Sequence, residues 1–470
     1  MVNRLLRLVR RLRALPVQAY YTLSGWRFSD LKSYVDQAIG SEADSTLALL
    51  ESRDPETGRP ARLAVVTCLP PDATGIANFA LKQLSEIGTV VDVFSQVRDV
   101  AHFLRVRAVL AAHTGGRVRL HPMASLLARD VTSRYERLVF MLGNSRHNYE
   151  VYRSMETLAG LGGGDRIVCH LHDPCCHNVV QLGKGLEPGP YLAYLGRLYD
   201  NPQLLANFGS ENWQAHKAAV DAGILGIRTL FDVGVRHFIV NSEAAARIVH
   251  EDLSPAESGE ARVDVLYHPV FEPEVSRRDA EPHDGNLTIG TFGAPSVSKG
   301  TNVVLAAVRE LRRRGVKAKL IIAGFDANYF ADGELAHMED RNWLELAEPT
   351  TERELQLDML KCDIAIQLRR TNLGESSGVV PSLLALGIPT IVSPIGAFAE
   401  YGDAVGSFDG YDPTALADLL ERGLQIDELA MQRYSREHSL AAFNTRFLSM
   451  LDLEPATSPV AQITPLRAQP

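Results

Sequence analysis

The residues best suited to hold an anion follow the apolar run 363–368 and a polar loop. Ser377 and Gly378 open a second apolar stretch, and Pro381 indicates where its helix must start. Proline has no amide proton and is tolerated only in the first helical turn, which predicts a helix that begins near Ser377. The backbone amides of Ser377, Gly378 and Val379 should then be free, and a helix dipole favours an anion beside such amides.

Glu375 and Ser376 immediately precede this predicted helix. A carboxylate next to an anion site indicates a ligand with one hydroxyl-rich part and one phosphate part, and a nucleotide sugar has both. The ordinary alternative is that Glu375 caps the helix. Ser376 and Ser377 could likewise cap the helix or bind phosphate.

Three basic residues could complete a phosphate site. Lys299 precedes another predicted helix, where a cation is mildly unfavourable, and its alternative role is that of a solvated lysine. Arg369 and Arg370 follow the apolar run 363–368, at the end of a predicted strand. A guanidinium there can grip a phosphate with two parallel hydrogen bonds, or can form a salt bridge at the rim of the site.

The N-terminal half offers three more candidates. Gly75 lies between an apolar run and a predicted helix, where its bare backbone leaves room for phosphate or an acceptor, or simply makes a tight turn. His172 and Asp173 end the apolar run 167–171. Asp173 could orient the imidazole or contact an acceptor, whereas the alternative for His172 is a buried ring satisfied by the backbone.

Potential zinc ligands crowd the same region, namely Cys169, His170, Cys175, Cys176 and His177. Neighbours on a strand point to opposite faces, and adjacent cysteines rarely share one tetrahedral site. The chain also lacks an Asp-x-Asp pair, the simplest means of holding a metal on a sugar diphosphate. We therefore predict no metal site and no cofactor beyond a nucleotide-sugar substrate.

Composition narrows the class of protein. The 470 residues are 46% hydrophobic and 22% charged, values typical of a globular protein with two or three domains. A net charge of −9 argues against general nucleic-acid binding. The five cysteines are odd in number and scattered, which favours a reducing, cytoplasmic compartment over a disulfide scaffold. No apolar run is long enough for a membrane span.

The first 60 residues look like a basic amphipathic extension. Arg4, Arg7 and Arg11 fall on one face of a predicted helix and leucines fall on another. Such a helix could contact an anionic membrane through residues 1–15, which would suit a lipid-linked acceptor and a peripheral location on the inner face. Packing against the protein through the leucines is the equal alternative.

The elements that must position these residues alternate between short apolar strands and helices. This pattern predicts an α/β protein with two doubly wound, Rossmann-like domains that face each other across a crevice. We place the domains at residues 61–271 and 287–430, separated by a charged, turn-rich stretch. A helical segment over 431–453 and a disordered tail over 454–470 complete the chain.

With both halves placed, the chain resembles the GT-B glycosyltransferases, within them the retaining family four and its bacterial subgroup that builds polysaccharides and glycoconjugates. The resemblance covers roughly residues 60–430. It rests on the order of several motifs: Pro70-Pro71-Asp72-Ala73-Thr74-Gly75, Leu142-Gly143-Asn144-Ser145, His172-Asp173, Gly290-Thr291-Phe292-Gly293, Lys299-Gly300, Gly374-Glu375-Ser376-Ser377-Gly378 and Gly396-Ala397-Phe398-Ala399-Glu400.

The resemblance implies a retaining transfer of sugar from a nucleotide-diphosphate donor to a glycan or lipid-linked acceptor. In that assignment Glu375 contacts the transferred sugar and His172 hydrogen-bonds it. The remaining donor contacts implied are Lys299, Arg369, Arg370, Ser376, Ser377, Gly378, Gly75, Gly293 and Ser382.

The chain also departs from the family pattern. A second glutamate usually follows the first by eight residues, but Leu383 stands there, or Ser382 when the count runs backward from Gly387. An arginine that usually precedes the Lys-Gly pair is missing, and Arg369 with Arg370 could replace its charge. These departures leave the donor nucleotide open. They also motivate one alternative, a non-catalytic sugar-nucleotide-binding protein. A separate alternative keeps the fold but changes the chemistry, to that of a nucleotide-sugar epimerase or a hydrolase.

Overall fold

The computed structural model describes residues 61–453, apart from 73, 98, 128, 208–211, 280–284, 335–340 and 424–425. The predicted amphipathic extension and the predicted disordered tail both lie outside the described residues. In the part of the chain described, no helix is both long and apolar enough to cross a bilayer.

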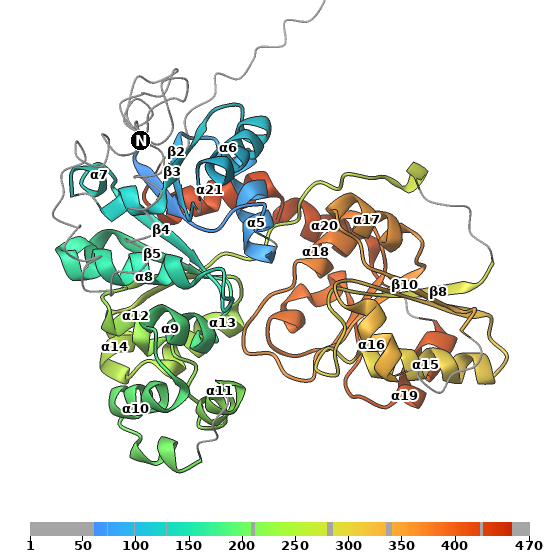
Figure 1. Ribbon diagram of the computed structural model, residues 1–470. Coiled ribbons are helices and arrows are strands. Elements are labelled where there is room, and N and C mark those ends of the chain that lie inside the picture. The colour runs from blue at the N-terminus through green and yellow to red at the C-terminus, as the bar shows by residue number, and fades with distance from the viewer. Residues whose placement is uncertain are drawn as a thin grey trace, which may run out of the picture.

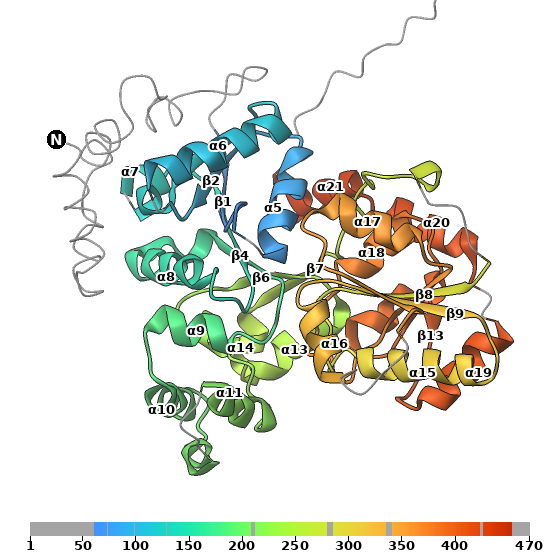
Figure 2. The same ribbon diagram turned by 45° about the vertical axis from the view of Figure 1, so that its right-hand side comes forward.

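The N-terminal domain is built on a seven-stranded parallel sheet with the strand order β3-β2-β1-β4-β5-β6-β7 (Figures 1 and 2). Its central strands are buried on both faces, which explains why their sequences are mostly apolar. The strands are β1 Leu63–Val66, β2 Val91–Ser95, β3 Val118–Pro122, β4 Arg137–Leu142, β5 Ile167–Leu171, β6 His237–Val240 and β7 Arg262–Val265.

Helices cover both faces of this sheet, and α10 and α11 extend away from it (Figure 1). The helices of this domain are α5 Gly75–Ser85, α6 Val100–Thr114, α7 Arg129–Thr132, α8 Tyr149–Leu158, α9 His177–Lys184, α10 Pro188–Leu198, α11 Asn212–Asp221, α12 Arg228–Asp232, α13 Glu243–Asp252 and α14 Pro255–Glu260.

The C-terminal domain repeats the plan with a six-stranded parallel sheet in the order β10-β9-β8-β11-β12-β13. The strands are β8 Leu287–Phe292, β9 Ala318–Ala323, β10 Leu344–Ala347, β11 Ile364–Gln367, β12 Thr390–Val392 and β13 Gly406–Ser407. The helices are α15 Thr301–Arg313, α16 Ala327–Glu334, α17 Glu352–Leu360, α18 Val379–Ala385 and α19 Pro413–Arg422. The predicted architecture of two doubly wound domains is confirmed.

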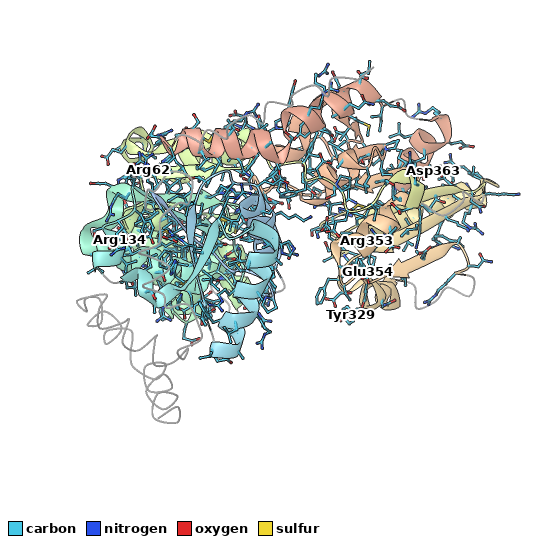
Figure 3. All side chains as sticks on the ribbon, turned by 90° about the horizontal axis from the view of Figure 1, so that it is seen from above. Arg62, Arg134, Tyr329, Arg353, Glu354 and Asp363 are labelled. Carbon is cyan, nitrogen blue, oxygen red and sulfur yellow. The ribbon has the colours of Figure 1, made fainter. Side chains whose placement is uncertain are left out.

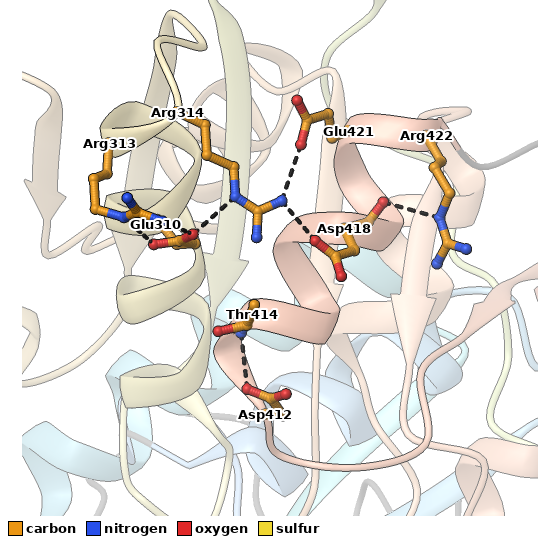
Figure 4. A network of polar contacts seen from close by, with 8 residues as sticks. All are labelled: Glu310, Arg313, Arg314, Asp412, Thr414, Asp418, Glu421 and Arg422. Carbon is orange, nitrogen blue, oxygen red and sulfur yellow. Dashed lines mark hydrogen bonds and ion pairs between the residues drawn. The ribbon is translucent and has the colours of Figure 1, made fainter.

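A charged network joins α15 to α19 (Figure 4). The Arg314 guanidinium donates to Glu310 in its own helix at 2.8 Å, and to Asp418 and Glu421 of α19 at 2.6 and 3.0 Å. This clamp fixes the far end of α15, the helix that begins directly after Lys299 and Gly300.

The chain finally returns to its first domain through α20 Glu428–Glu437 and α21 Leu440–Met450. Phe443 and Phe447 of α21 are buried in one apolar core with strands β1 and β2. In the view from above, the last helix runs along the domain on which Arg62 is labelled, while Glu354 and Tyr329 mark the other domain (Figure 3).

Candidate functional site

The amide end of α18 lies at the carboxyl edge of the C-terminal sheet. The helix begins at Val379, and the hydroxyl of Ser377 accepts the amides of Val379 at 3.2 Å and Val380 at 3.3 Å. The prediction of a free Val379 amide is therefore wrong, because Ser377 caps it. Within the described residues the amides of Ser377 and Gly378 have no recorded acceptor, so two of the three predicted donors are free.

Glu375 lies in a tight turn that is closed by its own hydrogen bonds. Its side chain accepts the amide of Leu373 at 2.7 Å, and Asn372 donates to the Glu375 carbonyl at 2.8 Å. Burial raises the pKa of the Glu375 carboxyl above its usual value, against the lowering effects of backbone amides and of Arg369. The carboxylate therefore does not cap α18, and it remains close to a guanidinium.

Two cations approach this turn. Burial, and then the nearby Arg369, lower the pKa of Lys299 to about 8. Burial also lowers the pKa of Arg369, whose guanidinium stacks 4.6 Å from the ring centroid of Phe398. Among the described residues neither cation forms an ion pair, and the Arg369 guanidinium donates only to the carbonyl of Leu368, at 2.8 Å. Two partly buried cations that repel each other indicate a site for an anion.

Arg370 and Ser382 lie at the edge of this group. Arg370 is exposed, donates to the carbonyl of Val297 at 3.0 Å and stacks 4.7 Å from the centroid of Tyr411. Ser382 donates to the Gly378 carbonyl at 3.1 Å from the partly exposed face of α18. Leu383 is completely buried. Of the two positions considered for the missing glutamate, only Ser382 can therefore face a ligand.

His172 belongs to the opposite domain and is held by a partner that the sequence had not indicated. Asn241 donates through its amide nitrogen to Nδ1 of His172 at 3.2 Å, and its oxygen contacts Nε2 of His170 at 2.9 Å. In this arrangement neutral His172 carries its proton on Nε2, which is buried and has no partner among the described atoms. Burial holds the pKa of His172 well below its usual range. The imidazole is thus a fixed, uncharged donor.

Asp173 does not orient that imidazole, contrary to one prediction, because its recorded hydrogen bond is with the amide of Cys175 at 3.0 Å. Burial, and then the charge of Glu375, raise the pKa of Asp173 to about 7. The charge of Glu375, in the C-terminal domain, therefore acts on Asp173 of the N-terminal domain.

His268, after β7, was not predicted. A methyl group placed on Gly378 would lie 3.6 Å from Nε2 of His268, so this imidazole faces the free amides of α18. Its Nδ1 contacts the Pro269 carbonyl at 3.0 Å, and burial lowers its pKa to about 4. No motif marks this histidine in the sequence, and only the folded chain brings it to the site.

Three glycines near the site, the predicted Gly75 and Gly293 and also Gly324, lack a side chain for different structural reasons. Gly75 begins α5 and has open space around its Cα, so it leaves room beside the site. Gly293 has a φ of +90°, and a methyl group there would lie 3.7 Å from Nζ of Lys299. Gly324 packs so closely that an added methyl would lie 2.3 Å from the Gly293 carbonyl oxygen.

The cysteines and histidines that the sequence analysis considered as zinc ligands are buried or hydrogen-bonded within the protein. His177 contacts the Tyr191 hydroxyl at 2.7 Å and the Ile224 carbonyl at 2.8 Å, while Cys169 and Cys176 are buried. In the described ranges no group of three or more His, Cys, Asp or Glu side chains could hold a metal ion.

Comparison with known proteins gives likenesses of structure rather than of sequence. No protein-family model matches the chain, and no curated protein matches it. The structure of HepE from Anabaena in complex with UDP-glucose is similar with a TM-score of 0.52 and 14% identity, over 83% of this chain and 99% of that chain. The structure of the UDP-forming α,α-trehalose-phosphate synthase from Burkholderia xenovorans, in complex with glucose-6-phosphate, is similar with a TM-score of 0.54 and 14% identity, over 83% of this chain and 100% of that chain.

The trehalose-6-phosphate synthase OtsA is similar to the same degree, with a TM-score of 0.54 and 14% identity over 83% of this chain and 99% of that chain. These likenesses, together with the two parallel sheets, show that the chain has the GT-B fold. The predicted fold class is confirmed.

Proposed function

We propose that this protein is a retaining, metal-independent glycosyltransferase that moves a sugar from a nucleoside-diphosphate donor to a glycan or lipid-linked acceptor. The observation that carries this proposal is the pair of partly buried cations, Lys299 and Arg369, beside the amides of Ser377 and Gly378. These two amides directly precede α18 and have no acceptor among the described residues. A diphosphate would supply the negative charge and the acceptor oxygens for these cations and amides.

The diphosphate would lie across Lys299, Arg369 and the amides of Ser377 and Gly378. These groups stabilise the negative charge that develops on the leaving nucleoside diphosphate, so they do the work that a metal ion does in other enzymes. The left-handed backbone of Gly293 brings the turn after β8 close to Nζ of Lys299 without a side chain in the way.

The sugar would lie between Glu375 and His172. The Glu375 carboxylate would accept a hydrogen bond from a sugar hydroxyl. Nε2–H of His172 would donate to another sugar oxygen, which supplies a partner for a buried atom that has none among the described residues. The acceptor then enters from the side of Gly75 and Asp173. Exclusion of water by the two domains protects the activated donor from hydrolysis.

The comparison structures suggest where to start with substrates. HepE was crystallised with UDP-glucose, and trehalose-6-phosphate synthase was studied for glycosyltransfer with retention. UDP-glucose is therefore the first donor to test, and GDP-, ADP- and CMP-sugars complete a thermal-shift panel. The segment 1–15 would bring the enzyme to an anionic membrane that carries a lipid-linked acceptor.

The decisive experiment compares Glu375→Gln and Lys299→Ala with the wild-type protein. Both variants should retain the fold, and each should lose transfer by roughly two to three orders of magnitude, as is typical when a charge-stabilising group is removed. Turnover is measured as nucleotide release with and without acceptor. Near-normal transfer in both variants would contradict the site assignment, and equal release without acceptor would indicate a hydrolase.

A further inference from the structure

The first turn of helix α13, in the N-terminal domain, is capped by a side chain from the other domain. Glu400 of the segment Gly396–Ala404 accepts the amide of Ala244 through Oε1 at 2.7 Å and the amide of Glu243 through Oε2 at 2.9 Å. Each carboxylate oxygen thus takes one of the amides that a helix leaves unsatisfied at its start. The negative charge also suits the positive end of the helix dipole.

A second contact joins the same helix to the turn that carries Glu375. The hydroxyl of Ser242 accepts the amide of Ala245 at 2.9 Å and donates to the carbonyl of Gly374 at 3.0 Å. This single buried hydroxyl therefore caps α13 and binds the residue next to Glu375.

The backbone of Gly374 also packs directly against the backbone of Ala245 in α13. Gly374 has a φ of +94°, and a methyl group on it would lie 2.8 Å from Cα of Ala245. Only a glycine therefore lets the turn rest on the first turn of α13. Figures 1 and 2 both show α13 at the side of its domain that meets the C-terminal domain.

The two contacts also act on one unit within the C-terminal domain. Asn372 accepts the amide of Gly374 at 3.0 Å and the amide of Ala397 at 3.2 Å. It thereby ties the turn of Glu375 to the segment Gly396–Ala404, which carries Glu400. A movement of α13 is therefore transmitted to Glu375 through both partners at once.

We infer that Ser242 and Glu400 are positioning residues that place Glu375 against the sugar only while the two domains are docked. The inference rests on the proposed function for the role of Glu375, but the contacts themselves are independent of it. The groups proposed to bind the diphosphate, namely Lys299, Arg369 and the amides of Ser377 and Gly378, all belong to the C-terminal domain. Loss of the docking contact should therefore affect sugar transfer more than nucleotide binding.

The test uses the full chain with Glu400→Gln and Ser242→Ala. Glutamine keeps one acceptor oxygen but turns an NH2 group toward the second amide, so Glu400→Gln should break the bidentate contact at nearly constant volume. Glu354→Gln is the matched control, because Glu354 accepts the amides of Thr350 at 2.7 Å and Thr351 at 3.2 Å within the C-terminal domain alone.

Hydrogen exchange gives a readout that needs no activity. In Glu400→Gln the amides of Glu243 and Ala244 should exchange about tenfold faster, the effect of one lost charge-assisted hydrogen bond. In Glu354→Gln these two amides should not change. Unchanged protection in Glu400→Gln would overturn the inference, whether or not the protein is a transferase.

Kinetics give the second readout. Both Glu400→Gln and Ser242→Ala should lower kcat for sugar transfer about tenfold while the affinity for UDP alone changes less than about twofold. Ser254→Ala is the control for Ser242→Ala, because Ser254 caps α14 in the same domain without touching the other domain. Equal kcat in Ser242→Ala and Ser254→Ala would overturn the positioning role. Should wild type transfer no sugar while exchange responds as expected, the proposed function fails and the docking contact stands.

Discussion

Lys299 is the cation of the site whose charge state should change just above neutral pH. Because burial and Arg369 lower its pKa to about 8, the ammonium is mostly protonated at pH 7 and mostly neutral at pH 9. Only the protonated form attracts a diphosphate, so the apparent affinity for UDP should fall as pH rises through 8. The limit is about tenfold per pH unit. Titration calorimetry at pH 7, 8 and 9 measures the slope.

Two substitutions separate this lysine from other titrating groups. In Lys299→Met the affinity should be low at every pH and the slope between pH 7 and 9 should vanish. In Lys299→Arg the charge persists, so the slope should also vanish while much of the affinity at pH 9 is kept. A slope in Lys299→Met equal to that of the wild type would show that another group titrates.

Individual residues were predictable where a motif marks them and unpredictable where only the fold brings them in. Glu375, Lys299 and Arg369 follow strands or precede helices, and the structure places them together. Asn241 and His268 were missed because each lies in an ordinary loop far along the chain from the residue it meets. The prediction of a free amide at Val379 was wrong for a local reason. Ser377, two residues before the helix begins, accepts that amide with its hydroxyl and so caps the helix.

At the scale of elements, the loop after β8, which carries Gly293, packs against the loop after β9, which carries Gly324. Their backbones are in direct contact at Gly324, whose missing side chain leaves room for the carbonyl of Gly293. In Gly324→Ala the new methyl would meet that carbonyl at 2.3 Å, so the turn beside Lys299 must shift. We expect a loss of about 1–3 kcal/mol in the free energy of unfolding, the usual cost of overpacking. UDP affinity should fall at least about tenfold. Urea titration and calorimetry measure the two quantities.

Gly259→Ala serves as the control for this element. Gly259 lies within helix α14, and a methyl group placed there meets nothing within 4 Å. Alanine also favours a helix over glycine, so this variant should be as stable as the wild type or slightly more so. Wild-type UDP affinity in Gly324→Ala would show that the contact between the two loops does not shape the phosphate site.

Elements were predictable in proportion to their burial. The strand Ile167–Leu171 was predicted with its final bounds because it is central, wholly buried and apolar at four of its five positions. The edge strands Val118–Pro122 and Leu344–Ala347 were missed because charged residues interrupt them. In the first of these the charge is hidden rather than exposed: Arg119 is buried against Asp92 of the neighbouring strand at 2.7 Å. Such a pair breaks the apolar pattern, yet it belongs to the interior.

At the scale of the whole molecule, the described part of the chain crosses between the two domains twice, and the two crossings are in contact. The amide of Val270 donates to the carbonyl of His438 at 2.7 Å, and Val270 pairs with Ser439 in a short parallel bridge. The first crossing leaves the N-terminal domain and the second returns to it. Any relative movement of the domains therefore bends both crossings at this bridge. The sequence predicted a helical segment over residues 431–453, but it did not indicate that α21 packs on the N-terminal domain.

The return of the last helix predicts that the N-terminal domain depends on the C-terminal end of the chain. Phe447 is fully buried among residues of β1 and β2, so Phe447→Ala should cost that domain about 3–5 kcal/mol of unfolding free energy. Phe325→Ala should cost close to nothing, because its ring is 77% exposed. Two domains need not unfold together, so hydrogen exchange resolved by segment is the suitable measurement. Protection should fall in β1 and β2 while β8 and β9 keep theirs, and UDP binding should survive. An equal loss in both sheets would mean instead that the domains unfold as one unit and that the last helix stabilises the whole chain.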